Sequence, residues 1–229
     1  MIVPTLAREW ALWKHGARRV AGVDEVGMAC LAGPVVAAAV VVKPHCRKIV
    51  GVRDSKTLSL AQREKLYPEI LRRCAGVAVG AASVAEINRL NIYHASHLAM
   101  SRALRRVQPV DHALIDGLTI RDIDLGPHTC IVDGDALSYA IASASIVAKV
   151  TRDRLMHKLA QRYPGYGWEH NVGYATPVHR RAIREQGLTP FHRAAFGTVK
   201  LMLLQPTTLD DLIQELESTE AEAGTPVLA

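Results

Sequence analysis

The chain has 229 residues, of which 49% are apolar, 22% are charged and 5% are aromatic, and its formal net charge is +6. This composition excludes a largely disordered protein, because it supplies the apolar side chains of an ordinary soluble core. No run approaches the roughly 20 consecutive apolar residues of a membrane span, and charged side chains between Arg8 and Arg19 argue against a signal peptide. We expect a cytoplasmic protein without membrane contact.

Three strands of one sheet are predicted early in the chain. Residues 19–25 form a first strand that ends in acidic side chains, and residues 34–42 form a continuous Val- and Ala-rich run. Such a run is typical of a central strand that is buried on both faces. A third apolar run covers residues 77–82, and the short separations favour an antiparallel meander, with a helix between the second and third strands.

Two helices are predicted around the third strand. Ser59 and Gln62 have the spacing of a capping box and mark the start of the first helix. Residues 92–107 form the second, with one apolar stripe and arginines on the other face. We interpret His94 and His97 on this helix as polar residues of a solvated face, because no nearby Cys or Glu completes a metal site.

The remaining elements follow in the second half of the chain. Two short strands, residues 113–116 and 130–132, precede a helix of small residues at 141–159. The segment 176–187 predicts another helix, because it has Thr as N-cap, Pro at the first helical position and Gly past the end. A short amphipathic helix is expected at residues 209–216.

This order of elements predicts a mixed α/β sheet with helices on both faces and a helical C-terminal appendage. A Rossmann fold is not supported, because no G-x-G-x-x-G follows the first strand. The glycines after that strand also lack the Gly-Lys-Ser/Thr sequence of a P-loop.

Acidic side chains end or follow three of the predicted strands. Asp24 and Glu25 close the first strand, Asp116 closes the fourth, and Asp135 follows the fifth. Four carboxylates gathered in one place repel one another unless cations bind, and Mg²⁺ and Mn²⁺ prefer carboxylate oxygens. Neighbours on a strand point to opposite faces, so Asp24 and Glu25 reach one site only if the strand ends or bulges there. One such acid is usually a turn former, but the repetition at three strand ends favours a metal site.

The charge distribution favours a nucleic-acid partner. Residues 201–229 contain six acidic side chains and no Lys or Arg, so residues 1–200 carry 28 basic and 16 acidic side chains, a formal charge of +12. Basic surroundings and an acidic, metal-filled centre indicate a nuclease with a pair of metal ions. A single-strand-binding module is disfavoured, because few aromatic side chains are available to stack on bases.

Eight segments of the chain together carry a resemblance to a known family. The first segment is residues 21–35, which begin with the sequence Ala-Gly-Val-Asp-Glu-Val-Gly. The other seven are Asp54-Ser55-Lys56, Ile115-Asp116-Gly117, Gly134-Asp135-Ala136, residues 142–153, Tyr163-Pro-Gly-Tyr-Gly, Gly173-Tyr174-Ala-Thr176 and His192-Arg193. In this order they resemble the motifs of the ribonuclease HII family, from about Trp10 to Lys200. The resemblance implies a ribonuclease H-like fold. It also implies endonucleolytic hydrolysis of the RNA strand of RNA–DNA hybrids, and cleavage 5′ to a ribonucleotide embedded in duplex DNA.

The resemblance also implies roles for individual residues. The catalytic quartet, which would bind two Mg²⁺ or Mn²⁺ ions, is Asp24, Glu25, Asp116 and Asp135. Tyr174 corresponds to the tyrosine that packs against the sugar at the ribonucleotide–deoxyribonucleotide junction, with a core or hinge aromatic as the alternative. Lys56 corresponds to a basic residue near the nucleic-acid path, with a solvated surface lysine as the alternative. The protein is expected to be a monomer.

One loop departs from the family pattern. The family's Gly-Arg-Gly, which senses the 2′-hydroxyl and the neighbouring phosphate, reads Gly27-Met28-Ala29 in this chain. Backbone donors survive the change, but the guanidinium is lost, and with it a charge-assisted hydrogen bond of roughly 1.5–3 kcal/mol. Ala29 adds strain if its φ must be positive. We expect weaker substrate binding or relaxed junction preference, with the metal chemistry intact.

We divide the chain into an N-terminal segment (1–18), a ribonuclease H-like catalytic domain (19–163), a helical substrate-binding appendage (164–204) and an acidic tail (205–229). Two other functions stay open at this point: a non-catalytic relative that only binds RNA–DNA hybrids, and another nuclease of the same fold, such as a junction resolvase. We interpret Asp153 as part of a structural ion pair or of a helix surface rather than as a fifth catalytic carboxylate.

Overall fold

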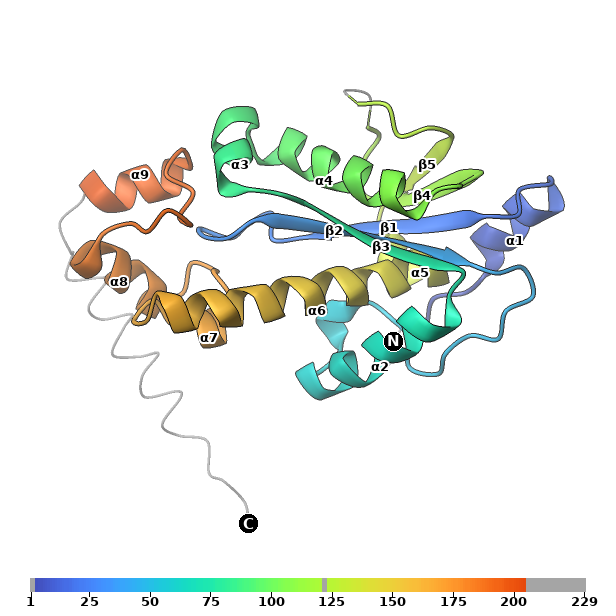
Figure 1. Cartoon of the computed structure of the whole chain (residues 1–229), viewed down its shortest axis with the longest axis horizontal. Helices are drawn as coiled ribbons and strands as arrows, with labels where there is room; N and C mark the ends of the chain where they lie inside the picture. The colour runs from blue at the N-terminus through green and yellow to red at the C-terminus, as the bar shows by residue number, and fades with distance from the viewer. Residues whose placement is uncertain (1–2, 121–122, 205–229) are drawn as a thin grey trace, which may run out of the picture. The chain divides into compact units, whose positions relative to one another are not determined.

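The computed structural model of the chain describes residues 3–120 and 123–204 (Figure 1). The chain separates into two compact units, of which the first comprises Met1–Met28 and Pro34–Arg154. The second comprises Ala29–Gly33 and the chain from Leu155 onward. The helix expected at residues 209–216 lies outside the described residues, and the functional division of the chain stays a prediction.

A five-stranded sheet forms the centre of the first unit, in the order β3-β2-β1-β4-β5. The expected antiparallel meander is confirmed: β1 (Val20–Val26) pairs with β2 (Val35–Val42), and β2 pairs with β3 (Gly76–Ala82). On the other side of β1, β4 (His112–Asp116) and β5 (His128–Ile131) run parallel to it. The sheet is therefore mixed, and every residue of β2 is buried.

Helices cover both faces of this sheet, as predicted. α4 (Ile92–Val107) lies on one face, and α6 (Tyr139–Arg162) lies on the other (Figure 1). Two glycines allow the close approach. A Cβ atom on Gly80 would overlap the Ala99 carbonyl oxygen of α4, and a Cβ atom on Gly22 would overlap the backbone of α6. The first unit thus has three layers, with the sheet between the helices.

Shorter helices complete the first unit. The predicted capping box is confirmed at Ser59 and Gln62, and it starts α2. The helices and their bounds are α1 (Ala7–Lys14), the 3₁₀ turn η1 (Ser55–Thr57), α2 (Leu60–Arg73), α3 (Val84–Leu90) and α5 (Gly134–Leu137). Of these, only α2 is predicted from the sequence.

The interpretation of the two histidines on α4 is correct for His94, which is exposed, and wrong for His97, which is buried. The ring centroid of His97 lies 4.1 Å from that of Tyr93, one turn earlier. His97 therefore belongs to the packed face of the helix, where its ring contacts that of Tyr93.

The second unit is small and aromatic. It contains the last turns of α6, followed by α7 (Trp168–Asn171), α8 (Pro177–Gln186) and α9 (Gly197–Leu204). The predicted start of α8 is confirmed, since the backbone N–H of His179 donates to Oγ1 of Thr176. Fully buried Trp168 lies at the centre of this core.

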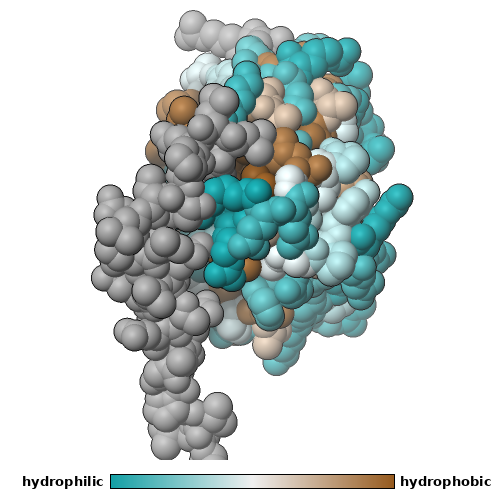
Figure 2. Space-filling model, turned by 90° about the vertical axis from the view of Figure 1, so that its left-hand side faces the viewer, coloured by the Kyte–Doolittle hydropathy of each residue, from teal (hydrophilic) through white to brown (hydrophobic). Residues whose placement is uncertain are grey.

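No helix among the described residues is long and apolar enough to cross a membrane. In the view of Figure 2, hydrophilic residues cover most of the coloured surface, and apolar residues form scattered patches.

Candidate active site

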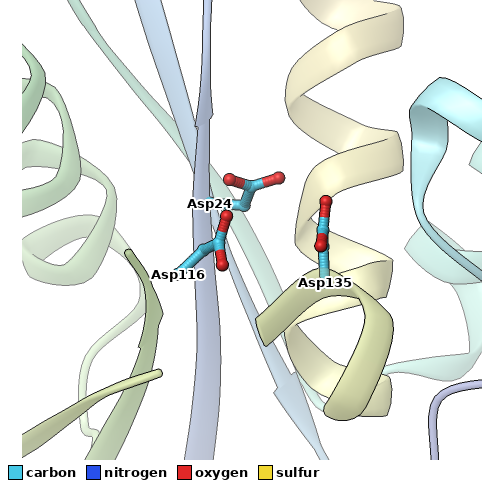
Figure 3. A group of neighbouring side chains, drawn as sticks. All are labelled: Asp24, Asp116 and Asp135. Carbon is cyan, nitrogen blue, oxygen red and sulfur yellow. The ribbon is translucent and has the colours of Figure 1, made fainter. Parts of the chain in front are cut away.

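Three carboxylates from separate segments of the chain meet in the first unit. Asp24 lies on β1, Asp116 is the last residue of β4, and Asp135 lies on α5. One oxygen of each lies within 4.8 Å of the others, and the three side chains point toward one another in Figure 3. The predicted convergence of carboxylates at the strand ends is therefore present for these three residues.

The turn between β5 and α5 brings Asp135 to the cluster. Asp133 adopts a left-handed conformation, and the backbone N–H of Gly134 donates to Oδ1 of Asp116 at 2.7 Å. A Cβ atom on Gly134 would lie 2.7 Å from the Ile141 side chain, so only glycine fits there without displacing a neighbour. This hydrogen bond joins the segments that carry Asp116 and Asp135.

Burial and mutual repulsion disfavour the ionised carboxylates. Burial, followed by the charges of Glu25 and Asp116, raises the pKa of Asp24 well above its usual range. Burial and then the charge of Asp116 raise the pKa of Asp135 to about 6. Burial also raises the pKa of Asp116, against the hydrogen bond from Gly134. Such a cluster attracts cations, because bound cations would remove the repulsion.

Glu25 lies outside the group of three that share the 4.8 Å range. It follows Asp24 within β1, which continues to Val26, and its backbone N–H donates to Oδ1 of Asp24 at 2.8 Å. Its side chain nevertheless senses the cluster: burial, followed by the charge of Asp116, raises the pKa of Glu25 to about 7. Alternation along the strand explains why Glu25 is near the cluster but not in it.

Lys56 lies beside the cluster, with its Nζ 3.6 Å from Oδ2 of Asp135, although 79% of its side chain is exposed. Partial burial alone would lower the pKa of Lys56, but the charges of Asp135 and Asp24 together raise it. Asp54, the first residue of the Asp54-Ser55-Lys56 motif, also raises the pKa of Asp135. The segment 54–56 thus places one acidic side chain, Asp54, and one basic side chain, Lys56, at the edge of the site.

Ser145 is a site residue that sequence reasoning missed. Its hydroxyl forms a hydrogen bond with Asp24 and lies 2.8 Å from the Ser55 hydroxyl, so it connects α6, β1 and the turn of Lys56. The available signal was the Ala-Ser-Ala-Ser run of α6, which indicates close packing without showing which hydroxyl faces the acids.

The altered loop begins at Gly27, which has a φ of +98° and packs against the fully buried Arg152 of α6. Met28 is half-buried and Ala29 is exposed. Ala29 is not among the described residues with positive φ, so the conditional expectation of strain at this position is not met. The interpretation of Asp153 as an ion-pair residue is confirmed, since it is buried and accepts from Lys149 at 2.8 Å.

Tyr174 belongs to the second unit and is 39% exposed. Its backbone N–H donates to the carbonyl of Asn171, and its own carbonyl lies 2.8 Å from Nδ1 of His179. The backbone of Tyr174 is thus fixed inside its unit, and its role toward a substrate stays a prediction.

Several known proteins of similar sequence share the same description. A family model described as Ribonuclease HII matches residues 21–199. The chain belongs to the ribonuclease HII family. It is 54% identical to the ribonuclease HII of Thermosynechococcus vestitus over 192 residues, which are 84% of this chain and 90% of that one. It is 52% identical to that of Ruegeria pomeroyi over 206 residues, which are 90% and 87% of the two chains.

Solved structures confirm the ribonuclease H-like α/β fold. The ribonuclease HII of Archaeoglobus fulgidus, solved in complex with PCNA, is 27% identical with a TM-score of 0.67, covering 84% of this chain and 99% of that one. The ribonuclease H2 of Pyrococcus horikoshii is 27% identical with a TM-score of 0.64, covering 81% and 97%. This ribonuclease HII is accordingly an endoribonuclease that acts on nucleic acid.

The carboxylates of this ribonuclease HII fit a hard divalent cation. Their donor atoms are oxygens, which Mg²⁺ and Mn²⁺ prefer. Oδ2 of Asp135 is buried and accepts no hydrogen bond, although Lys56 lies 3.6 Å away. A buried carboxylate oxygen without a hydrogen-bond donor is suited to ligate a cation.

Proposed function

We propose that this ribonuclease HII depends on divalent cations, hydrolyses the RNA strand of RNA–DNA hybrids and cleaves 5′ to ribonucleotides embedded in duplex DNA. One observation carries the proposal: Asp24, Asp116 and Asp135, from three separate segments, offer oxygens within 4.8 Å of one another. Burial and then the charges of neighbouring carboxylates raise the pKa values of Asp24 and Asp135, and burial raises that of Asp116.

In this proposal, Asp24, Asp116 and Asp135 hold Mg²⁺ or Mn²⁺ with the help of Glu25, and two ions are present in the active complex. A bound pair of such ions would supply an activated water and would stabilise the leaving oxygen of the phosphodiester. Two hydrogen bonds position these ligands. The backbone N–H of Gly134 donates to Asp116, and the Ser145 hydroxyl bonds to the Asp24 carboxylate.

Substrate selection falls to other residues. Lys56 faces Asp135 with most of its side chain exposed, which suits a contact to a nucleic-acid phosphate. Backbone N–H groups of Gly27, Met28 and Ala29 would sense the 2′-hydroxyl, and Tyr174 would pack against the sugar at the junction. Because Met28 stands where the family has arginine, recognition of the junction is weaker in this chain.

The partner of the protein is its nucleic-acid substrate, and we propose that it acts as a monomer. The Archaeoglobus fulgidus relative was solved with PCNA, but the tail of this chain carries no recognisable clamp-binding sequence. A cytoplasmic location stays a prediction from the sequence. The alternative, a relative that binds hybrids without cleaving them, rests on the altered loop at Gly27-Met28-Ala29 alone.

Product mapping on a labelled duplex with one ribonucleotide tests the proposal. With Mg²⁺ or Mn²⁺, we expect cleavage 5′ to the ribonucleotide, and with EDTA we expect none. Asp116→Asn should abolish cleavage while retaining duplex binding in a gel shift. Cleavage that persists in EDTA would overturn the metal dependence. Retention of the duplex without cleavage by the unaltered chain would instead support the binding-only alternative.

A further inference from the structure

A second site candidate lies in the first unit at the other end of the sheet. A pocket of about 270 Å³ is lined by residues of the segment that follows β2 and of the end of α2. It begins at Val42, which pairs with Val20 at the start of β1, whereas Asp24 pairs with Ala38. Four residues of strand correspond to about 13 Å, so the pocket is separate from the carboxylate cluster.

Four cations and no carboxylate line this pocket: Lys43, Arg47, Arg72 and Arg73. Arg72 is paired with Glu69 at 2.6 Å, and Nη2 of Arg73 donates to the carbonyl of Arg47 at 3.0 Å. Within the described residues, the side chains of Lys43 and Arg47 have no hydrogen bond or ion pair with the protein. The pocket therefore holds positive charge that no residue of the described ranges neutralises.

The deeper wall of the pocket is neutral. Burial raises the pKa of the Cys74 thiol and of the Tyr139 hydroxyl to about 12 each, and burial also raises that of Cys46. The Tyr139 oxygen accepts from the backbone N–H of Ile49 at 2.9 Å, which fixes the ring. An anion that entered the pocket would meet polar neutral groups below and cations at the rim.

One carboxylate acts on this wall from inside the protein. Glu9 contributes to the raised pKa of Cys46, after burial. Its Oε1 accepts from the Ser138 hydroxyl at 2.6 Å and from the Ala140 backbone N–H at 2.8 Å. Glu9 is fully buried and does not line the pocket. It therefore does not pair with Lys43 or Arg47.

We propose that this pocket binds a phosphate group. Guanidinium and ammonium groups match phosphate oxygens in charge and in hydrogen bonding, and two of the four cations are available without breaking a bond of the fold. The phosphate can belong to the backbone of nucleic acid that extends past the cleavage site, which rests on the proposed function, or to a free phosphate compound. Both sources present the same chemistry to Lys43 and Arg47.

The first measurement uses inorganic pyrophosphate and the full chain in metal-free buffer. Titration calorimetry should show binding that Lys43→Ala combined with Arg47→Ala weakens at least tenfold. The matched control combines Arg89→Ala with Arg105→Ala, which removes the same charge from exposed positions on α3 and α4. Because all four side chains are exposed, the circular dichroism and Tm of both double variants should equal those of the unaltered chain.

The second measurement uses an all-DNA duplex of 24 base pairs, which offers no ribonucleotide to cleave. The slope of log binding constant against log salt should fall by about 1.8 in the Lys43/Arg47 double variant, because each lost phosphate contact contributes about 0.9. The control variant should keep the slope of the unaltered chain.

The two readouts separate the sources of phosphate. A reduced slope assigns the pocket to the nucleic-acid backbone, and loss of pyrophosphate binding with an unchanged slope assigns it to a free phosphate compound. If neither readout distinguishes the Lys43/Arg47 variant from its control, the pocket binds no phosphate and the proposal is wrong. Neither readout involves cleavage, so failure of the hydrolytic proposal would leave this test intact.

Discussion

Arg152 lies against Gly27, with its guanidinium in the space that a Cβ atom on Gly27 would occupy. Arg152 is fully buried on α6, and its Nε donates to the Pro34 carbonyl at 3.0 Å. Gly27 itself has a φ of +98°, which side chains with a Cβ rarely adopt. The end of β1 and the start of the altered loop are thus held by a buried cation.

Gly27→Ala should therefore be destabilising for two separate reasons, backbone strain and overlap with Arg152. Gly16→Ala is the matched control, because Gly16 has a φ of +93° and nothing within 4 Å of its Cβ position. Urea denaturation should show a loss of about 1–3 kcal/mol from strain in both variants, and a further loss only at Gly27. Equal losses of unfolding free energy in the two variants would mean that the Arg152 side chain moves aside without destabilising the protein.

Met28→Arg should strengthen recognition of a single ribonucleotide in duplex DNA. A restored charge-assisted hydrogen bond of about 1.5–3 kcal/mol corresponds to a rise in kcat/KM of roughly ten- to 150-fold. Because Ala29 has an ordinary φ, adding Ala29→Gly should contribute little to this rise. Steady-state cleavage of one labelled duplex by Met28→Arg, by Ala29→Gly and by the combination gives the comparison. An unchanged kcat/KM in the combined variant would show that the side chain at position 28 takes no part in substrate recognition.

Local signals explain which elements could be predicted. The strands of the meander follow from apolar runs, and the start of α2 follows from Ser59 and Gln62, since both signals involve residues close in sequence. α3 was missed, although Ser83 and Glu86 form an equivalent capping box. Its seven residues are too few to show a clear apolar period.

The site was predictable to the extent that strand ends determine it. Asp116 and Asp135 meet Asp24 because β4 and β5 run parallel to β1. Glu25 lies outside the group of three because β1 continues past it to Val26, so that its side chain alternates with that of Asp24. The bond of Ser145 to Asp24 and the burial of Arg152 arise between segments more than 100 residues apart in sequence. No local pattern in the sequence predicts contacts between residues so far apart.

Glu9 should make the stability of the protein depend on pH. It is fully buried, Oε2 has no hydrogen-bond partner, and burial raises its pKa above 4.5 despite the bond from Ser138. The folded state therefore binds a proton that the unfolded state has lost, and stability falls as pH rises from 4.5 through the folded pKa.

Glu9→Gln keeps an acceptor for Ser138 and Ala140 but carries no charge. We expect it to match the unaltered protein near pH 4.5 and to become the more stable of the two as pH rises. Urea denaturation at pH 5, 6.5 and 8 gives the difference in unfolding free energy, in which the shared titration of the acidic cluster cancels. Glu9→Ala should lose about 3 kcal/mol near pH 4.5, because two buried donors lose their acceptor. Its deficit against the unaltered protein should shrink as pH rises, because it too lacks the titrating carboxyl. A difference between Glu9→Gln and the unaltered protein that does not change with pH would contradict this account.

Two neutral histidines organise the second unit. Nε2 of His179 accepts from the indole N–H of Trp168 at 2.9 Å, and its Nδ1 lies 2.8 Å from the Tyr174 carbonyl. Nε2 of His192 lies 3.1 Å from Nε2 of His179, and Nδ1 of His192 accepts from the Thr189 backbone N–H at 2.9 Å. When His179 carries its proton on Nδ1 and His192 carries its proton on Nε2, the donors of Trp168 and His192 share the one lone pair of His179 Nε2.

Protonation of His192 should therefore destabilise the protein in mild acid. Burial, followed by the neighbouring His179, lowers the pKa of His192 from 6.5 to about 4. Between these values the unfolded chain binds a proton that the folded chain does not, so stability is complete above pH 6.5 and falls as pH falls toward 4. The loss is on the order of 3 kcal/mol at most, at about 1.4 kcal/mol per unit of pKa. Urea denaturation at pH 7, 6 and 5 should show a shallower pH dependence for His192→Gln than for the unaltered protein. His157→Gln, which removes a histidine of α6 outside the network, should keep the original dependence, and an unchanged slope in His192→Gln would show that His192 does not cause the loss.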